Sequence, residues 1–446
     1  METLKDEGGI IAVGKSHSDG CENIAEKIYM GLLSLQHRGQ DSAGIAAAQG
    51  EGVYCYKEQG LVSEVFNDKI LSEINGDMFL AHVKNGGKRE WFSLNAQPMV
   101  ISYRHGSLAV AFNGALVNGP QLRELLENDG VMFTTQSDSE ILAAMVARRD
   151  KGDTAAVAAE IMPALRGGYA AVIMTSRRII GMRDPHGIRP LALGRVGNRY
   201  VLASESCVFD MMGGHLVRDL MPGEVLSIEG DILQSVCTSM KKTHAGCIFE
   251  YIYLASPDST IDSCNVYLSR ERSGYILAQE SPVNADIVTG VPDSGTAAAL
   301  GYARGSGIPY SLGLTMNRYI GRTFIQATQA ERERSVRIKL NAIKPVVENK
   351  RVVLVDDSIV RGTTMRHLVS ALRKAGAAEV HLRISSPPVG HGCKFGINAD
   401  KYDLAGGNNL GADSLAHISI DGMLASLESP AFDFCIGCFS GKYPDV

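Results

Sequence analysis

Two adjacent aspartates, Asp356 and Asp357, stand where an apolar run meets a short loop. The run Val352–Val355 is typical of a buried strand, and the loop passes through Gly362 before a helical pattern begins. Two carboxylates at the carboxyl end of a strand are suited to hold ribose hydroxyls or Mg²⁺. The start of a helix beside a glycine is suited to an anion, because backbone N–H groups point outward there and the glycine permits close approach. The stretch therefore predicts a phosphate site next to an acid pair, and a solvated acidic turn is the plainer alternative.

Two cysteines near the end of the sequence, Cys435 and Cys438, have the C-x-x-C spacing. By itself this spacing is found in zinc sites, in redox pairs and in thiols without a role. The nine cysteines are an odd number spread over 446 residues, which argues against the disulfide framework of a small secreted protein. The pair is a candidate metal or redox site.

The elements that position these residues belong to a second half in which apolar strands alternate with helices. After about residue 240 this βαβ pattern predicts an α/β architecture with a doubly wound parallel sheet. A helix between the last two strands is expected to end near Gly376 and carries Met365, Leu368 and Leu372 on its apolar face. The buried parallel strands are expected at Asp286–Thr289, Arg351–Val355 and Glu379–Ser385.

The first half has a different pattern, short strands mixed with a few helices, which is typical of an antiparallel-rich α+β layer. Apolar residues recur at helical spacing from Ile24 to Leu35. Ser137 to Glu140 resembles a capping box at the start of a helix. Strand-like runs at Tyr169–Met174 and Val225–Ile228 are separated by Gly-Gly, Asp-Pro and Pro-Gly turns. We place the boundary near 237–243, which gives domains 1–240 and 241–446.

Composition limits the classes of protein that the chain can belong to. A length of 446 residues favours two domains, and 44 Lys and Arg against 49 Asp and Glu give a net charge of −5. That charge argues against a nucleic-acid or membrane-surface partner. Residues 1–7 do not look like a secretory signal, and no apolar run is long enough to span a membrane. We therefore expect a cytoplasmic protein.

The stretch Asp356–Thr364 is similar to the signature of type I phosphoribosyltransferases that binds phosphoribosyl pyrophosphate (PRPP). Beyond it, the chain resembles the glutamine PRPP amidotransferase (amidophosphoribosyltransferase) family almost end to end. The resemblance implies an N-terminal αββα domain like the class II, N-terminal-nucleophile glutamine amidotransferases. A type I phosphoribosyltransferase domain with a cysteine-rich C-terminal segment would follow it. The other segments that carry the resemblance are Gln36–Gly44, Asp184–Leu191, Val291–Ser294, Asn317–Gln326 and Ile384–Pro388.

In the second domain the resemblance implies a catalytic set of Asp356, Asp357 and Lys339. The two aspartates would hold the ribose hydroxyls and Mg²⁺, with Ser294 near the metal, and Lys339 would neutralise the pyrophosphate. The segment that contains Asn317 and Arg322 would close over PRPP and exclude water. The residues expected to cradle the 5-phosphate are Ser358, Ile359, Val360, Arg361, Gly362, Thr363 and Thr364.

Two positions of the second domain depart from the family pattern. Met316 stands where the family usually has lysine, and Ser256 stands where it usually has arginine. Both changes remove positive charge near an expected polyanionic ligand. They predict either weaker binding of PRPP or a site adapted to another substrate, and neutral drift is the alternative, above all for Ser256.

The first domain lacks the residues that hydrolyse glutamine in the family. Gly8 stands where family members have the nucleophilic cysteine, and Lys84 stands where an arginine grips the glutamine carboxylate. The expected oxyanion donors Asn113 and Gly114 survive, and Arg38 and Asp138 match substrate-contacting positions. We predict that glutamine hydrolysis is lost and that the surviving residues serve the structure; retained glutamine binding is the alternative.

The resemblance also implies a role for four of the cysteines. Cys247 and Cys393, together with Cys435 and Cys438, match the positions that hold a [4Fe–4S] cluster in some family members. Such a cluster would be structural and would tie the end of the chain to the second domain. Four buried or free thiols are the alternative.

The predicted function is displacement of pyrophosphate from PRPP by ammonia or another nitrogen nucleophile. A purine-like base in a specialised nucleotide pathway is one alternative acceptor. The ordinary family role in purine synthesis, with an amidase partner supplying ammonia, is a second alternative, and a regulatory pseudoenzyme that binds PRPP or nucleotides is a third. By resemblance we expect a homodimer or a homotetramer.

Overall fold

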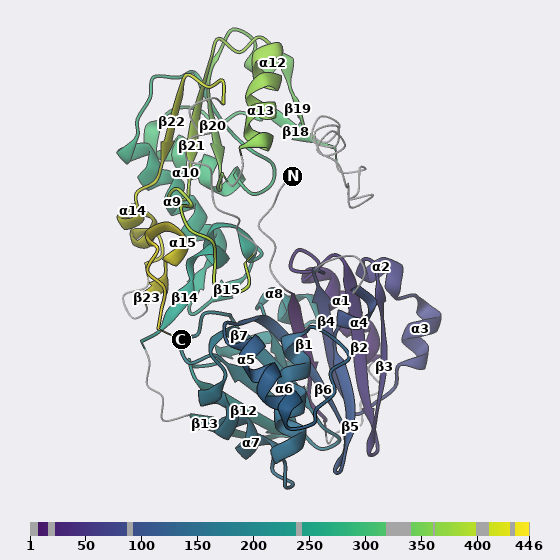
Figure 1. Ribbon diagram of the computed structural model, residues 1–446. Coiled ribbons are helices and arrows are strands. Elements are labelled where there is room, and N and C mark those ends of the chain that lie inside the picture. Colours follow the sequence, from purple (N-terminus) through teal and green to yellow (C-terminus); the bar gives the residue numbers. More distant parts are fainter. Residues whose placement is uncertain are drawn as a thin grey trace.

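The computed structural model describes residues 8–16, 23–86, 92–237, 243–317, 340–359, 362–397, 410–428 and 433–445. They form two bodies, with the C-terminal segment (yellow in Figure 1) packed on the second. None of the described helices combines the length and the apolar character that a membrane crossing requires.

The first body contains two antiparallel sheets, as predicted for the first half of the chain. One sheet has the order β11(His215–Asp219), β9(Ala192–Val196), β10(Arg199–Ala203), β1(Gly9–Val13), β4(Met78–Lys84), β2(Ser42–Gln49), β3(Gly52–Gln59). The other has the order β13(Ile232–Cys237), β12(Glu224–Glu229), β8(Ile179–Arg183), β7(Gly167–Met174), β6(Gly106–Leu116), β5(Met99–Tyr103).

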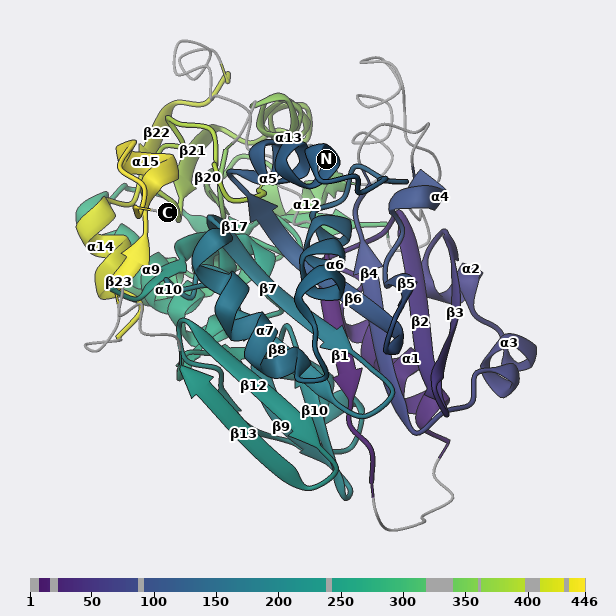
Figure 2. The ribbon, with the colours of Figure 1, turned by 60° about the horizontal axis from the view of Figure 1, so that its bottom comes forward.

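The alternation of side chains along β1 shows how the layers are built. Ile10 and Ala12 point into the core between the two sheets, while Ile11 and Val13 pack against helices on the outer face. The second sheet has its own helical layer, so the body has the αββα order that the family resemblance implied (Figure 2). The outer helices are α1(Ile24–Ser34), α2(Val62–Val65), α3(Asp68–Glu73) and α8(Cys207–Met211) on the first sheet, and α5(Gly119–Asn128), α6(Asp138–Arg149) and α7(Thr154–Ile161) on the second.

The expected capping box at the start of α6 forms only in part. Ser137 is the N-cap, and its side chain accepts a hydrogen bond from the N–H of Ser139. The carboxylate of Glu140 does not return to the N–H of Ser137; it accepts the N–H groups of Thr134 at 2.8 Å and Thr135 at 2.7 Å. The hydroxyls of both threonines also donate to it, so the preceding turn outcompetes the cap for this carboxylate.

The second body contains a parallel sheet covered on both faces, which confirms the predicted doubly wound arrangement. Val352 and Leu354 of its second strand pack toward α13, and Val353 and Val355 pack toward α9 and α10. The sheet order is β17(Ile287–Gly290), β20(Arg351–Asp356), β21(Glu379–Ile384), β22(Ser414–His417), and the helices are α9(Val266–Glu280), α10(Thr296–Ser306), α12(Lys344–Val347), α13(Thr363–Lys374) and α14(Ile420–Ala425).

Short elements join the rest of this body to the sheet. A π-helical turn, η3, spans Glu250–Leu254 and precedes a small hairpin. The C-terminal segment adds a strand beside the first strand of the body, so that Cys435 lies opposite Cys247. These elements are β14(Ala245–Cys247) with β23(Asp433–Cys435), β15(Thr260–Ile261) with β16(Cys264–Asn265), β18(Leu314–Met316) with β19(Leu340–Ala342), and α15(Gly437–Ser440).

Candidate active site

The acid pair lies at the carboxyl end of β20. Asp356 and Asp357 are only 8% and 6% exposed. The N–H of Asp357 donates to Oδ1 of Asp356 at 3.0 Å, and Oγ of Ser358 donates to Oδ1 of Asp357 at 2.5 Å. Burial raises the pKa of both carboxyls, and for Asp356 the adjacent Asp357 raises it further. Two carboxylates held this close in a buried place are a strong site for a cation or for hydroxyl donors.

Two residues from other elements oppose the rise in the pKa of Asp357. The nearby Ser294 hydroxyl and the positive charge of Arg270 both favour the ionised form of this carboxyl. Arg270 is held in α9 by bonds from Nε to the carbonyl of Tyr251 at 2.7 Å and from Nη2 to the carbonyl of Ala255 at 2.8 Å. The family resemblance predicts Ser294 near the metal. Arg270 could not be predicted, because no motif marks an arginine in a helix that precedes Asp357 by 87 positions.

The loop after the acid pair leads into α13, as the sequence predicts. Gly362 is the N-cap of this 12-residue helix and has a φ of 69°, a left-handed conformation that favours glycine. Thr363 and Thr364 form its first positions. The side chain of Ile359 packs in the core of the sheet and is 4% exposed, so only its backbone is available to a ligand. Val360 and Arg361 lie outside the described residues.

Only some of the remaining residues that were expected to bind PRPP lie within the described part of the chain. Asn317 is exposed just after β18, whereas Met316 packs against the core of the parallel sheet. Arg322 and Lys339 lie outside the described residues. Ser256 sits at the contact between the two bodies, where its N–H donates to Oε2 of Glu205 at 2.8 Å.

Position 8 of the first body has no room for a side chain. Gly8 has a φ of 151°, and a Cβ atom built there would lie 2.4 Å from Cε1 of His82 and 2.4 Å from the carbonyl oxygen of Val83. His82 is fully buried, and burial holds its pKa well below the usual histidine value. The carbonyl of Phe112 is near the ring, but neither ring nitrogen makes a hydrogen bond of normal geometry with a described residue. The buried imidazole therefore stands, neutral, where a nucleophile at position 8 would extend.

Other members of the expected glutamine site lie in the same region. Among the described residues, the fully buried amide of Asn113 has no hydrogen-bond partner on either atom. Gly114 has a φ of 116°, and a Cβ atom there would lie 2.1 Å from the carbonyl oxygen of Gly168. The carboxylate of Asp138 accepts the N–H of Leu116 at 2.8 Å, and burial raises its pKa. Lys84 lies close enough to lower the pKa of both Asp138 and His82.

Arg38 lies beside the start of β1, where a Cβ atom at Gly9 would be 3.3 Å from its Cδ. Its guanidinium is fully buried and joins the two bodies: Nη2 lies 2.6 Å from Oε2 of Glu250, and Nε donates to Glu205. The adjacent positive charge holds the pKa of Glu205 well below its usual range despite burial. Both acids were missed at the sequence level, where a lone Glu in a loop or a short turn carries no signal.

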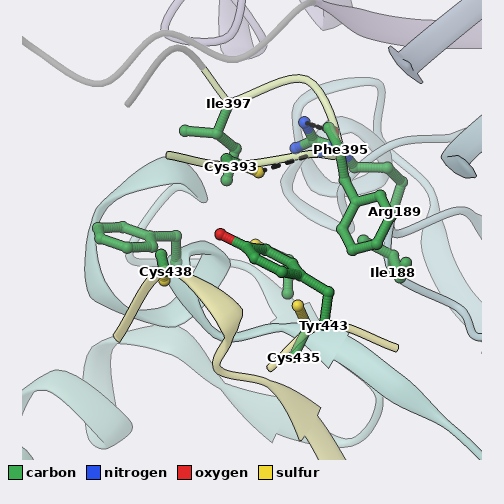
Figure 3. Close-up of a pocket in the computed structure, with 10 residues that line it drawn as sticks. Ile188, Arg189, Cys393, Phe395, Ile397, Cys435, Cys438 and Tyr443 are labelled. Atoms are coloured by element: carbon green, nitrogen blue, oxygen red, sulfur yellow. Dashed lines mark hydrogen bonds between the residues drawn. The ribbon is translucent and has the colours of Figure 1, made fainter. Parts of the chain in front are cut away.

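A separate candidate site is the cavity that all four predicted cluster cysteines line (Figure 3). Burial raises the pKa of Cys247, of Cys438 and of Cys435, the last to about 11. The neighbouring cysteines contribute to each rise. Within the described ranges, no group of three or more His, Cys, Asp or Glu side chains is arranged to hold a metal ion.

Comparisons with known proteins agree with this geometry. A family described as "Glutamine amidotransferase domain" matches residues 91–210, and one described as "Phosphoribosyl transferase domain" matches residues 272–385. Together with the αββα body and the acid pair on a parallel sheet, these matches define a phosphoribosyltransferase that carries a glutamine amidotransferase domain.

The whole chain aligns with curated relatives. The amidophosphoribosyltransferase of Bacillus subtilis (strain 168) is 46% identical over 100% of this chain and 95% of its own length. That of Archaeoglobus fulgidus is 44% identical over 97% of both chains. The solved structure of glutamine PRPP amidotransferase from B. subtilis complexed with ADP and GMP superimposes with a TM-score of 0.90, at 45% identity and over 98% and 97% of the two chains. The chain belongs to the amidophosphoribosyltransferase family and is a phosphoribosyltransferase enzyme.

Proposed function

We propose that this enzyme transfers the phosphoribosyl group of PRPP to a nitrogen nucleophile, with release of pyrophosphate and without hydrolysis of glutamine in the same chain. The observation that carries the transferase half is the pair Asp356 and Asp357, buried at the end of β20 directly before the loop and helix start of α13. The proposal that this chain does not hydrolyse glutamine rests on the absence of space for a side chain at Gly8.

The acid pair has the chemistry that the transfer needs. Asp356 and Asp357 would bind the ribose hydroxyls and Mg²⁺, with the Ser294 hydroxyl beside Asp357. A bound Mg²⁺ supplies positive charge that stabilises the departing pyrophosphate. Arg270 fixes a further positive charge beside the pair. The N–H groups and hydroxyls at Thr363 and Thr364 would bind the 5-phosphate at the start of α13.

The first body cannot supply ammonia by the family's cysteine chemistry. A glycine has no nucleophile, and the neutral, buried His82 beside it has no open approach to a substrate amide. Free ammonia, or ammonia from a partner protein, is therefore the proposed nucleophile, and a purine-like base remains the alternative acceptor. We further propose a cytoplasmic homodimer or homotetramer.

The four-cysteine cavity has the donor set that a [4Fe–4S] cluster takes, four cysteine sulfurs. A cluster binds each thiolate at a different iron, so its ligands stand farther apart than four ligands of one ion. The donor set is four sulfurs from three separate segments, and the rest of the lining is mostly apolar. The neighbouring sulfurs contribute to the raised pKa values of Cys247, Cys435 and Cys438, and bound iron would favour their thiolates. Cys247, Cys393, Cys435 and Cys438 would hold the cluster, which would brace the C-terminal segment.

The transferase proposal is tested by pyrophosphate release from PRPP with Mg²⁺ and ammonium. Asp357→Asn is expected to lower kcat/KM by about 10²-fold or more, because an amide is a poor ligand for Mg²⁺. Its melting temperature should not fall, since a buried charge is removed. Asp421→Asn changes an exposed acid in the same body and is the matched control. Unchanged turnover in Asp357→Asn would exclude the acid pair as the catalytic site.

A further inference from the structure

The cavity lined by the four cysteines is also lined by an aromatic residue, Tyr443, that has no role as a cluster ligand. Tyr443 follows α15, and its ring projects into the cavity that the cysteines line (Figure 3). The residue is only partly buried, so it stands between the thiols and solvent. Cys247, Cys435 and Cys438 are each less than 9% exposed.

Tyr443 is anchored firmly on the side of the cavity that carries Cys393. Its hydroxyl donates to the carbonyl of Gly392 at 2.5 Å. Its ring meets the ring of Phe395 edge to face, with centroids 5.7 Å apart and planes at 77°. Nζ of Lys394 lies 5.0 Å from the centroid of the same ring, within the range of a cation–π contact. These three contacts hold the Tyr443 side chain against the segment that contains Cys393.

The Tyr443 ring also lies directly on the turn between Cys435 and Cys438. A Cβ atom at Gly437, within the C-x-x-C segment, would lie 2.3 Å from Cδ1 of Tyr443. This close approach explains why the second inner position of the segment is glycine, since any side chain there would displace the ring. One residue therefore bridges the Cys393 loop and the Cys435–Cys438 turn.

These two segments are also joined without Tyr443. The N–H groups of Gly390 and His391 both donate to the carbonyl of Cys438 at 3.0 Å. Strand β23 holds Cys435 opposite Cys247 through backbone pairing. Loss of the tyrosine ring should therefore open the cavity on one side without separating the cysteines.

We propose that Tyr443 is the shielding residue of the four-cysteine cavity and limits the access of dissolved reagents to its sulfur atoms. Where the cluster is bound, these reagents are oxygen and iron chelators; in the metal-free chain, they are thiol-modifying compounds. The part of the inference that concerns oxygen rests on the proposed cluster. The part that concerns the thiols does not.

The experiment compares the full-length wild type with Tyr443→Phe, Tyr443→Leu and Tyr443→Ala, and uses Tyr275→Ala as the matched control for an exposed tyrosine. In metal-free protein, the rate of alkylation by N-ethylmaleimide is measured by mass spectrometry at Cys393, Cys435 and Cys438. Cys55, in the first body, is the internal reference. In anaerobically purified protein, iron and sulfide per chain and the loss of visible absorbance in air are measured.

We expect alkylation of the cavity cysteines to be about tenfold faster or more in Tyr443→Ala, and unchanged at Cys55. Bleaching in air should accelerate in parallel, and Tyr443→Phe should stay near the wild type because the ring remains. Tyr443→Leu answers the same question if the alanine variant fails to fold. Equal alkylation rates in wild type and Tyr443→Ala or Leu would overturn the inference. A wild type that contains no iron would overturn the cluster while leaving the alkylation result decisive for Tyr443.

Discussion

The imidazole of His82 occupies the space that a side chain at Gly8 would need, with Cε1 2.4 Å from the Cβ position of residue 8. The backbone there has a φ of 151°, which residues other than glycine rarely adopt. The backbone conformation and the neighbouring atoms at position 8 therefore both favour glycine.

Restoring the cysteine alone should not restore a glutaminase. In Gly8→Cys we expect no glutamate release from glutamine, because the thiol has no space beside His82 and the carboxylate grip of an arginine is still missing at Lys84. The side chain should also destabilise the fold by about 2–5 kcal/mol, from backbone strain and overpacking together. Glutamate assays and thermal melting measure the two effects.

Gly152→Ala is the control for this variant, since Gly152 has a φ of 111° and open space around its Cβ position. It should show the strain of the backbone without the clash. The steric account of position 8 would be wrong if Gly8→Ala lost no more stability than Gly152→Ala, or if Gly8→Cys hydrolysed glutamine.

Removing Arg38 should weaken the joint between the two bodies. Arg38→Met leaves Glu205 and Glu250 buried without their shared partner, and loss of one member of a buried ion pair typically costs about 3–5 kcal/mol. Arg38→Lys should recover part of this, because it keeps the charge but not the forked geometry. Arg148→Met breaks an exposed pair with Asp129 and should cost about 0–1 kcal/mol. Melting temperatures rank the three variants.

The effect of Arg38 has a definite pH dependence. The pKa of Glu205 is depressed in the folded protein, so the stabilisation from its ionised form is complete above the ordinary glutamate pKa. It is lost only as the pH falls through the lower, folded-state pKa. In Arg38→Met the burial of Glu205 is no longer opposed by Arg38, so the pKa of Glu205 should rise above its ordinary value. The stability gap between wild type and Arg38→Met should therefore narrow as the pH falls, starting above the ordinary glutamate pKa of about 4.3. A gap that stays constant down to about pH 3 would contradict this assignment.

Asp219 should show the opposite pH dependence. Burial, with the nearby charge of Asp262, raises the pKa of Asp219 to about 6, although Arg183 opposes the rise. Between the ordinary aspartate pKa and about 6 the folded state binds more protons than the unfolded state, so this residue adds stability as the pH falls through that range. Asp219→Asn should be more stable than the wild type at pH 8, and the difference should shrink toward pH 5. Melting curves at both pH values test it; a constant difference would show that Asp219 does not titrate in this range.

The parts of the fold that follow from local pattern could be predicted from the sequence. The apolar run from Val352 to Val355, the two acids and the helix start after Gly362 lie within a few residues of one another, so strand β20, the loop and helix α13 were all predicted. The doubly wound sheet follows from the same spacing. The capping box at Ser137 was only half right, because Thr134 and Thr135 compete for the carboxylate of Glu140 and a four-residue motif does not include them.

The parts that could not be predicted depend on contacts between distant segments. Arg38 and Glu250 are 212 positions apart in the chain, and nothing local to either indicates their ion pair. Tyr443 and Gly392 meet only because the C-terminal segment folds back on the second body. Ile359 was named with the phosphate loop, yet its side chain turns into the core, a direction that loop residues do not reveal by type.

The most direct test of the central claim is the choice of nitrogen donor. Pyrophosphate and glutamate are measured together in reactions that contain PRPP and Mg²⁺, with ammonium, with glutamine, or with neither. The account predicts pyrophosphate with ammonium, more at higher pH where more NH₃ is free, and no glutamate or pyrophosphate above background with glutamine. Glutamate and pyrophosphate formed together from glutamine would contradict it.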